Sequence, residues 1–413
     1  MAQTSYHDDI VVVDATRSVI GGVGGGLKDL SAAQLAAPIV DHLLTRIEER
    51  SPAFSRDVVD AMMLGLCIGA GTGQNLPRQI AHATGMNEIA SALVVNEMCG
   101  SGLEAVILGV HALRLGEATV ALVGGVESPS TSPWLITTEQ LIGWKEKTVG
   151  EIQEKVVRAD LHDALWDRMF DVHTIQHAED TTRHWVQQRG LDAQVFKRRI
   201  DDYAKLSHDR ALAAMAHGDF AEEIAVIPGT GSCDELPAKK NLAIMYKRRG
   251  TQFTPDGEFL SHHNSPPLGD CAAFLVLMRA ETAAELGLAP LARVSGYAKA
   301  GVVPERFLLA SMRAVRRLFE KTGRSANDYD LIESNTAFGS QMLINQTELG
   351  LDMQRVNIRG DCLALGHPVG AAGARILTSL IYALRHNDLR RGLASICLGG
   401  GNGIAMSVER PEA

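Results

Sequence analysis

Short apolar runs alternate along the chain with longer segments of helical periodicity. The short runs are rich in β-branched residues and are bounded by glycine or aspartate, which is typical of buried strands. Four examples are residues 10–13, 92–95, 119–123 and 395–398. Residues 103–115 and 374–384 instead place apolar side chains three and four positions apart, as an amphipathic helix does. This alternation predicts a layered α/β fold.

Two segments of the chain have the same order of predicted elements. Small residues after Cys99 lead into one predicted helix, and small residues after His367 lead into another. Each half also has an apolar strand that runs into glycines, at Gly124 in the first and at Gly399 in the second. The pattern indicates an internal duplication. Repetition of ordinary α/β units explains it equally well.

The stretch from Trp144 to about Pro237 has a different character. It is charged and predominantly helical in pattern. Long segments outside a core often form lids or binding loops, so an inserted helical region over an active site fits. A solvated helical face is the alternative.

Composition narrows the classes of function. Forty Lys and Arg against 49 Asp and Glu give a net charge of −9, which argues against a nucleic-acid partner. The six cysteines form no close pairs, so they suit a reducing compartment better than a disulfide framework. No apolar run approaches the roughly 18 residues of a membrane span, and the first residues do not resemble a leader. We therefore expect a cytoplasmic protein without membrane association.

Cys99 is a candidate nucleophile because it stands between a predicted strand and the start of a helix. Unpaired backbone N–H groups and the positive end of the helix dipole favour a thiolate there. The glycines at 100 and 102 would let a thioester approach the backbone. The alternative is a buried small hydrophobic residue, which is the commoner role of an isolated cysteine.

His367 is a candidate general base. Pro368 favours an extended backbone at His367, and the small residues that follow allow a close turn into a helix. An imidazole with a pKa near ~6.5 suits removal of a thiol proton at neutral pH. A structural histidine is the alternative.

Cys397 precedes the glycine-rich turn 398–403, whose N–H groups could stabilise an oxyanion. Phosphate binding is disfavoured there, because neither a P-loop nor a dinucleotide-binding spacing is present. The glycine runs 21–26 and 69–73 fail the same tests. Cys99, His367 and Cys397 could also be metal ligands, but no pair has the short spacing that such sites usually have.

Taken together, these segments resemble the thiolase family from about Val11 to Glu409. Five ordered motifs carry the resemblance. They are Asn96-Glu97-Met98-Cys99-Gly100-Ser101-Gly102, Gly124-Gly125-Val126-Glu127-Ser128, Asn335-Thr336-Ala337-Phe338, Gly366-His367-Pro368 and Cys397-Leu398-Gly399-Gly400-Gly401.

The resemblance implies a thiolase fold, in which two similar βαβαβαββ halves form a five-layered αβαβα core with an inserted helical loop domain. We place the N-terminal half at residues 1–285, with the inserted domain at about 128–255, and the C-terminal half at 286–413. The resemblance also implies a homodimer or homotetramer.

The resemblance further implies reversible Claisen condensation and thiolysis of β-ketoacyl thioesters. Cys99 would be acylated, His367 would activate it, and Cys397 would exchange a proton with the α-carbon of the second substrate. Backbone N–H groups of Cys99 and Gly399 would form one oxyanion hole, and His367 with a water on Asn335 would form the other. The substrates would be acyl-CoA and acetyl-CoA or CoA, with neither a cofactor nor a metal.

The resemblance also suggests contacts to the substrate, at His173, Asn264, Ser265 and Phe338. A set of basic residues could contact the phosphates of coenzyme A, although basic loop residues are more often only solvated. These are Lys239, Lys240, Lys247, Arg248 and Arg249.

The chain departs from the family pattern around the substrate pocket. Thr336 follows Asn335 where the family usually has Glu, and Asp361 adds an acidic side chain before His367. Thr174-Ile175 replaces Met-Gly, Pro266 replaces a Ser, and residues 307–310 replace a Met-Gly-x-Gly-Pro stretch. We therefore predict active chemistry on an unusual acyl group or acceptor.

Two alternatives remain open. One is a specialised acyltransferase in the same fold that uses a non-acetyl acceptor or a carrier-bound substrate. The other is a catalytically silent subunit that binds acyl chains or partners. A silent subunit has no need of Cys99, Asn335, His367 and Cys397 together, so their presence argues against it.

Overall fold

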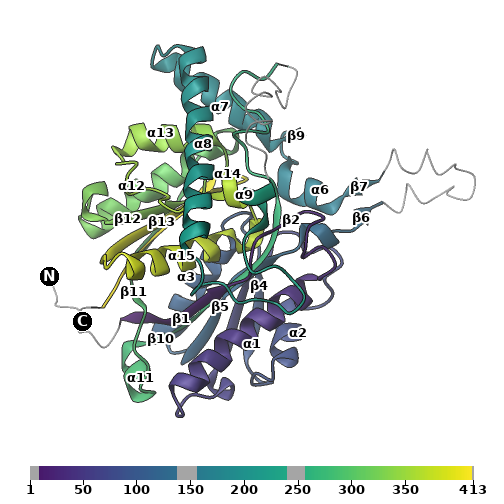
Figure 1. Ribbon diagram of the computed structural model, residues 1–413, viewed down its shortest axis with the longest axis vertical. Coiled ribbons are helices and arrows are strands. Elements are labelled where there is room, and N and C mark those ends of the chain that lie inside the picture. Colours follow the sequence, from purple (N-terminus) through teal and green to yellow (C-terminus); the bar gives the residue numbers. More distant parts are fainter. Residues whose placement is uncertain (1–8, 137–155, 240–255, 412–413) are drawn as a thin grey trace, which may run out of the picture.

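The computed structural model describes residues 9–136, 156–239 and 256–411, and its main sheet runs continuously through two α/β halves (Figure 1). The first half contributes the strand order β4-β3-β5-β10-β1, and the second continues it as β11-β14-β13-β12. The halves join where Val11 and Val12 of β1 pair with Arg293 and Ala292 of β11. The strands are β1 (Ile10–Arg17), β3 (Ala61–Gly65), β4 (Ser91–Val95), β5 (Val120–Glu127), β10 (Gly269–Arg279), β11 (Ala292–Gly301), β12 (Leu331–Ser334), β13 (Arg391–Leu398) and β14 (Asn402–Glu409).

The two halves differ slightly in their strands. The first has the five strands that the resemblance implies, whereas the described part of the second has four. Val356 occupies the place beside β12, where it forms an isolated parallel bridge with Ile332. Short strand pairs lie outside the core, namely β2 (Gly21–Gly22) on β10, β6 (Trp134–Leu135) with β7 (Val157–Arg158), and β8 (Trp166–Asp167) with β9 (Val172–His173).

Helices α3 (Ser101–Leu115) and α15 (Ala372–His386) pack against each other and against the strands of both halves, forming the central layer. Their contact depends on glycine. A Cβ at Gly373 would lie 2.4 Å from the backbone nitrogen of Leu103, and one at Gly102 would lie 2.9 Å from that of Ala374. Because one helix follows Cys99 and the other follows His367, their close packing brings these two residues together.

The segment 98–115 has the length and mean hydropathy, 1.3, of a membrane span, but 61% of it is buried inside the protein. Its apolar side chains belong to the main hydrophobic core. The expectation that no apolar run approaches the length of a span was therefore wrong for this segment, although its packing is that of a core helix.

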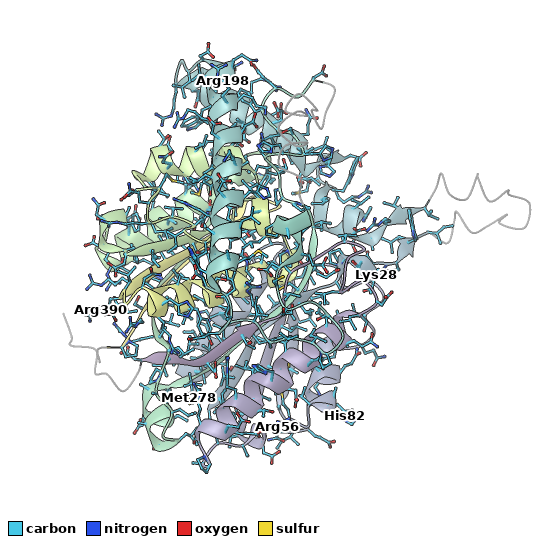
Figure 2. The ribbon with its side chains drawn as sticks, viewed as in Figure 1. Lys28, Arg56, His82, Arg198, Met278 and Arg390 are labelled. Carbon is cyan, nitrogen blue, oxygen red and sulfur yellow. The ribbon has the colours of Figure 1, made fainter. Side chains whose placement is uncertain are left out.

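The outer layers complete the five-layered arrangement that the resemblance predicts. α1 packs on β1, β5 and β10, and α12 packs on β11, β13 and β14. Met278 of β10 is fully buried, whereas Lys28, Arg198 and Arg390 are exposed at the periphery of the molecule (Figure 2). The covering helices are α1 (Ala32–Arg50), α2 (Leu76–Ala83), α11 (Ala280–Glu285), α12 (Ala310–Thr322) and α13 (Gly339–Leu349).

Strand β4 differs from the prediction of a buried strand. It pairs with β3 and forms the edge of the sheet, with Leu93 39% and Val94 41% exposed. An edge strand has a neighbour on one side only, so an apolar run alone does not establish burial.

The region between β5 and β10 is helical, as its pattern predicts. Its helices are α6 (Ala159–Leu165), α7 (Thr174–Gln188), α8 (Ala193–His217) and α9 (Glu235–Lys239). The Glu179 carboxylate of α7 accepts three backbone hydrogen bonds, from Glu258, Phe259 and Leu260, and so fixes the returning chain. The proposed phosphate contacts Lys240, Lys247, Arg248 and Arg249 lie outside the described residues, as does the side chain of Lys239.

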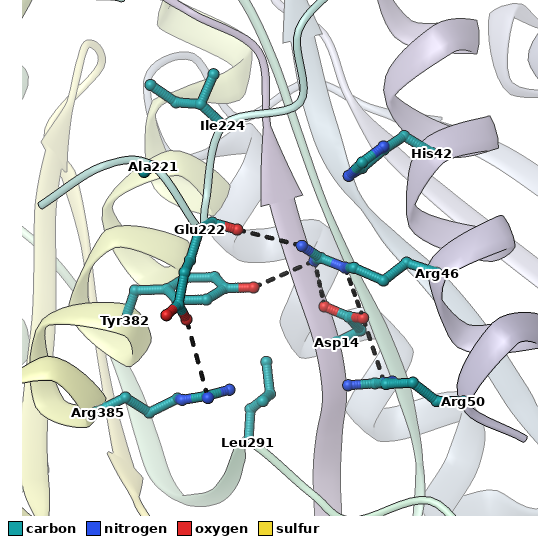
Figure 3. A pocket seen from close by; sticks show the side chains of 10 residues that line it. All are labelled: Asp14, His42, Arg46, Arg50, Ala221, Glu222, Ile224, Leu291, Tyr382 and Arg385. Atoms are coloured by element: carbon teal, nitrogen blue, oxygen red, sulfur yellow. Dashed lines mark hydrogen bonds and ion pairs between the residues drawn. The ribbon is translucent and has the colours of Figure 1, made fainter. Parts of the chain in front are cut away.

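A cavity of about 410 Å³ marks the junction of α1, α15 and the segment after α8 (Figure 3). Arg46 Nε donates to Asp14 Oδ2 at 3.0 Å, and Arg46 Nη2 donates to the Tyr382 hydroxyl at 3.1 Å. Arg46 Nη1 also reaches the Glu222 carbonyl at 3.1 Å. One arginine therefore connects both halves and the inserted region.

Candidate active site

Cys99 lies in a tight turn between β4 and α3. Met98 before it has φ +51°, a left-handed conformation that non-glycine residues rarely adopt and that is often found at functional sites. The Ser101 hydroxyl donates to the Met98 carbonyl at 2.6 Å and accepts from the Glu97 N–H at 2.9 Å, which fixes this turn. A Cβ at Gly100 would lie 2.5 Å from Leu398 Cδ2, so glycine there lets the turn approach the end of β13.

His367 lies on the other side of the site, after the short helix α14 (Cys362–Leu365). Its N–H donates to the Pro267 carbonyl at 2.8 Å and its carbonyl accepts from the Gly269 N–H at 3.2 Å, so its backbone is paired as the following proline favours. His367 Nε2 lies 3.0 Å from Cys99 Sγ. The structure thus brings together the nucleophile and the base that the sequence singled out.

The charge state of this pair differs from the expected thiolate. Burial raises the pKa of the Cys99 thiol to about 12, although backbone N–H groups of Gly399 and Cys99 partly offset this effect. Burial, with a contribution from Arg375, lowers the pKa of His367 to about 3. Desolvation therefore outweighs the helix N-terminus, and the resting pair is a thiol and a neutral imidazole.

Cys397 and Asn335 lie at the ends of neighbouring strands, Cys397 in β13 and Asn335 just after β12. Both side chains are fully buried. The pKa of Cys397 is raised by burial and by the nearby Cys99. Neither polar atom of the Asn335 amide has a hydrogen-bond partner within the described chain. A buried amide with unused donors and acceptors is suited to hold a water or a substrate oxygen.

A cavity of about 630 Å³ opens onto the pair, with Cys99, His367 and Gly399 in its wall. Most of its other lining is apolar, as is usual for sites that bind small molecules. Of the expected substrate contacts, His173, Ser265 and Phe338 line it. Over residues 9–136, 156–239 and 256–411, no group of three or more His, Cys, Asp or Glu side chains is arranged to hold a metal ion.

Asn264 is not part of the cavity wall. Its Nδ2 donates to Asp201 Oδ1 and to the Phe259 carbonyl, both at 2.9 Å, and its Oδ1 accepts from the Ser261 N–H at 3.0 Å. The amide is thus occupied by α8 and by its own loop, which gives Asn264 a structural position, and its role as a substrate contact stays a prediction.

His173 has a second role besides lining the cavity. Its Nδ1 accepts from the Ile175 N–H at 3.1 Å and caps α7. This leaves Nε2 as the polar atom of His173 that a ligand could use.

Several lining residues were not expected from the sequence. Phe307 packs edge-on against Phe338 at 6.4 Å between ring centroids, and Arg158, which also lines the cavity, pairs with Asp160. Gly22 and Gly25 also line the cavity, so the first glycine run belongs to the site although it is not a phosphate loop. The glycine run was the available signal for Gly22 and Gly25, and the departure from the family pattern at 307–310 was the signal for Phe307, whereas Arg158 carried none.

Glu127 explains why the second motif contains an acidic residue. Its carboxylate accepts hydrogen bonds from the N–H groups of Cys67 and Ile68, both at 3.1 Å, and of Gly370 at 2.7 Å. Burial raises the pKa of Glu127 to about 7 despite these bonds. Glu127 thereby joins the loop after β3 to the segment that follows His367.

The two departures from the family pattern nearest the reactive groups meet in space. The Thr336 hydroxyl donates to Asp361 Oδ2 at 2.5 Å. The carboxylate absent at position 336 is therefore supplied beside it by position 361.

Comparison with known proteins agrees with this geometry. Residues 10–281 match the thiolase N-terminal domain and residues 288–410 match the thiolase C-terminal domain. The chain belongs to the thiolase family. An acetyl-CoA acetyltransferase of Pseudomonas aeruginosa is 35% identical over 97% of this chain and 99% of its own. One from Allochromatium vinosum is 33% identical over 98% and 100%.

Solved thiolase-fold structures superpose over almost the whole chain. The acetyl-CoA acetyltransferase of Bacillus anthracis gives a TM-score of 0.86 at 33% identity, covering 98% of this chain and 99% of its own. A thiolase of Ascaris suum in complex with coenzyme A gives 0.86 at 29% identity, covering 98% and 100%. This thiolase-family chain is an acyltransferase, and neither the silent subunit nor the carrier-dependent enzyme is favoured by these relatives.

Proposed function

We propose that the protein catalyses reversible thiolysis and Claisen condensation of β-ketoacyl-CoA thioesters through an acyl-Cys99 intermediate. The observation that carries this proposal is the 3.0 Å between Cys99 Sγ and His367 Nε2 in the wall of an apolar cavity. In thiolysis, His367 accepts the thiol proton while the sulfur attacks the keto carbon of the substrate. N–H groups of Cys99 and Gly399 stabilise the resulting oxyanion.

The bond between the keto carbon and the α-carbon then breaks and leaves an acetyl-CoA enolate. His367 and a water held by Asn335 stabilise the enolate oxygen, and Cys397 donates its proton to the enolate carbon. The raised pKa of Cys397 suits this step, because it keeps the thiol protonated until the enolate forms.

The second half-reaction restores the enzyme. The sulfur of an incoming CoA attacks the acyl carbon and passes its proton to Cys397, while Cys99 leaves and recovers its own proton from His367. Every proton returns to its starting residue, so the reverse sequence gives condensation with the same groups.

The cavity wall supports an acyl group larger than acetyl. Ile175 and Phe307 occupy two segments where the chain departs from the family pattern, and both line the cavity with Phe338. Apolar side chains at these points favour an apolar acyl substituent. We expect acetoacetyl-CoA to be cleaved more slowly than by common biosynthetic thiolases, and equal rates would contradict this expectation.

Intact-protein mass spectrometry tests the covalent half of the mechanism. Wild type and Cys99→Ala are each mixed with a series of acyl-CoAs and then with CoA. We expect an acyl adduct on the wild type only, which CoA removes, with the best-retained acyl group identifying the substrate class. A wild type that acquires no adduct from any donor would refute the proposed function.

We also propose that the protein is a cytoplasmic homodimer or homotetramer. The apolar edge strand β4, with Leu93 and Val94 exposed, immediately precedes the Cys99 turn and would be covered by a second copy. Sedimentation equilibrium of wild type and of Val94→Lys tests this idea. A monomeric wild type at micromolar concentration would contradict it.

A further inference from the structure

Asp361 is a buried carboxylate that accepts five hydrogen bonds and exposes only 1% of its surface. Oδ1 accepts from the Ser207 hydroxyl at 2.6 Å and from the Leu363 N–H at 2.9 Å. Oδ2 accepts from the hydroxyls of Tyr203 and Thr336, both at 2.5 Å, and from Asn357 Nδ2 at 3.1 Å. Asp361 does not line the active-site cavity.

The five donors come from three parts of the molecule. Thr336 directly follows Asn335 at the end of β12. Leu363 lies in α14, which leads to His367, and Asn357 lies in the segment just before α14. Tyr203 and Ser207 belong to α8 of the inserted region. A single carboxylate therefore connects the Asn335 turn, the His367 segment and the inserted helices.

The Asn335 side chain adjoins this anchor through Thr336, the next residue in the chain. Its amide is fully buried and makes no hydrogen bond with the described chain, so no side-chain contact of that kind fixes its orientation. Its backbone is held instead, by its N–H to the Ser395 carbonyl at 2.8 Å and by its carbonyl to Gln341 Nε2 at 3.2 Å. The next residue, Thr336, is fixed by its hydroxyl on Asp361.

We propose that Asp361 is a positioning residue that, through Thr336, sets the Asn335 amide where the enolate oxygen forms. This inference rests on the proposed function of Asn335. A charge-assisted hydrogen bond in a buried site restricts its partners strongly. The enolate-forming step therefore depends on the Thr336 hydroxyl, while acylation of Cys99 by a simple acyl-CoA does not.

A set of matched variants tests the proposal. Thr336→Val removes the hydroxyl at nearly constant shape, Thr336→Ser retains it, and Tyr203→Phe removes a different hydroxyl from the same carboxylate oxygen. Acylation by acetyl-CoA is followed by rapid-quench mass spectrometry. Enolate formation is followed as α-proton exchange of acetyl-CoA in deuterium oxide with the acetylated enzyme.

We expect Thr336→Val to slow α-proton exchange by about 10- to 100-fold, with acylation within about 3-fold of wild type. Thr336→Ser should retain most of the exchange rate, and Tyr203→Phe should affect it much less than Thr336→Val does. If Thr336→Val does not fold, Thr336→Ala removes the same hydroxyl and gives the same comparison.

Two results would overturn the proposal. One is that Thr336→Val slows acylation and α-proton exchange equally, and the other is that Thr336→Val and Tyr203→Phe slow exchange equally. Both results are expected if the hydrogen-bond network only stabilises the fold. A wild type that forms no acyl-Cys99 would refute the proposed function itself, so the two failures are distinguishable.

Discussion

Cys99 Sγ and His367 Nε2 lie 3.0 Å apart although the two residues are separated by 268 positions in the chain. The packing of α3 on α15, the two helices that follow these residues, explains their contact. Because burial raises the pKa of the thiol and lowers that of the imidazole, the pair rests in its neutral form. Proton transfer then accompanies attack on the substrate, and does not precede it.

The neutral pair predicts how Cys99 reacts with iodoacetamide. A thiolate is the reactive species, and a thiol with a pKa raised to about 12 contains little thiolate at pH 7. We expect the alkylation rate to rise about tenfold per pH unit from pH 7 to 10. Peptide mapping after short exposures measures the rate at Cys99, with the exposed Cys233 as an internal reference. A rate that is already constant above pH 7 would indicate a thiolate–imidazolium pair instead.

The role assigned to Cys397 predicts that its loss slows thiolysis much more than it slows acylation of Cys99. In Cys397→Ala, we expect acyl-CoA to label Cys99 within a few-fold of the wild-type rate, because the first oxyanion hole is intact and CoA can leave as a thiolate without the proton that Cys397 otherwise supplies. Thiolysis of a β-ketoacyl-CoA should fall about 10²- to 10⁴-fold, since no acid remains for the enolate. Cys271→Ala, at another fully buried cysteine, is the control and should leave both rates nearly unchanged. Loss of Cys99 labelling in Cys397→Ala would contradict the assignment.

We predict that Gly125 of β5 cannot be replaced without a steric clash. A Cβ there would lie 2.3 Å from the Gly370 carbonyl oxygen and 2.9 Å from Ala371 Cα, both just after His367. We expect Gly125→Ala to cost about 1–3 kcal/mol of stability and to lower activity by displacing the His367 segment. In Gly69→Ala the new Cβ would meet only Leu66 Cδ2, at 3.8 Å, so Tm and kcat should stay at wild-type values. Equal behaviour of the two variants would argue against this explanation.

The junction in Figure 3 predicts a loss of stability without a loss of chemistry. Asp14 is buried and pairs with Arg46 and Arg50, so Asp14→Asn leaves two arginines without their counter-charge. We expect Tm to fall by several degrees, while acylation per folded enzyme is unchanged. Arg385→Gln removes an exposed pair at 3.9 Å from Glu222 and should change Tm by about 1 °C or less. Calorimetry of both variants makes the comparison, and an unchanged Tm in Asp14→Asn would refute it.

The sequence was sufficient for features that depend on neighbouring residues. The strand–turn–helix around Cys99, the extended backbone at His367 and the Gly-rich end of β13 all follow local rules, and the structure has them in place. The exposure of Leu93 and Val94 was not predictable in the same way, because it depends on which strand forms the sheet edge. The side chains of Thr336 and Asp361 meet across 25 positions, so no local pattern could indicate that one carboxylate serves both.

The attachment of α8 to Asp361 has an evolutionary consequence. The inserted region lines the acyl cavity through Arg158, Leu161 and Ile175, and it also holds the carboxylate that underlies the Asn335 turn. Under the proposed role of Asp361, substrate preference and turnover therefore both depend on the inserted region. Mutations that reshape the inserted helices to admit a new acyl group would also disturb turnover, so lineages that change substrate are expected to acquire compensating changes around position 361.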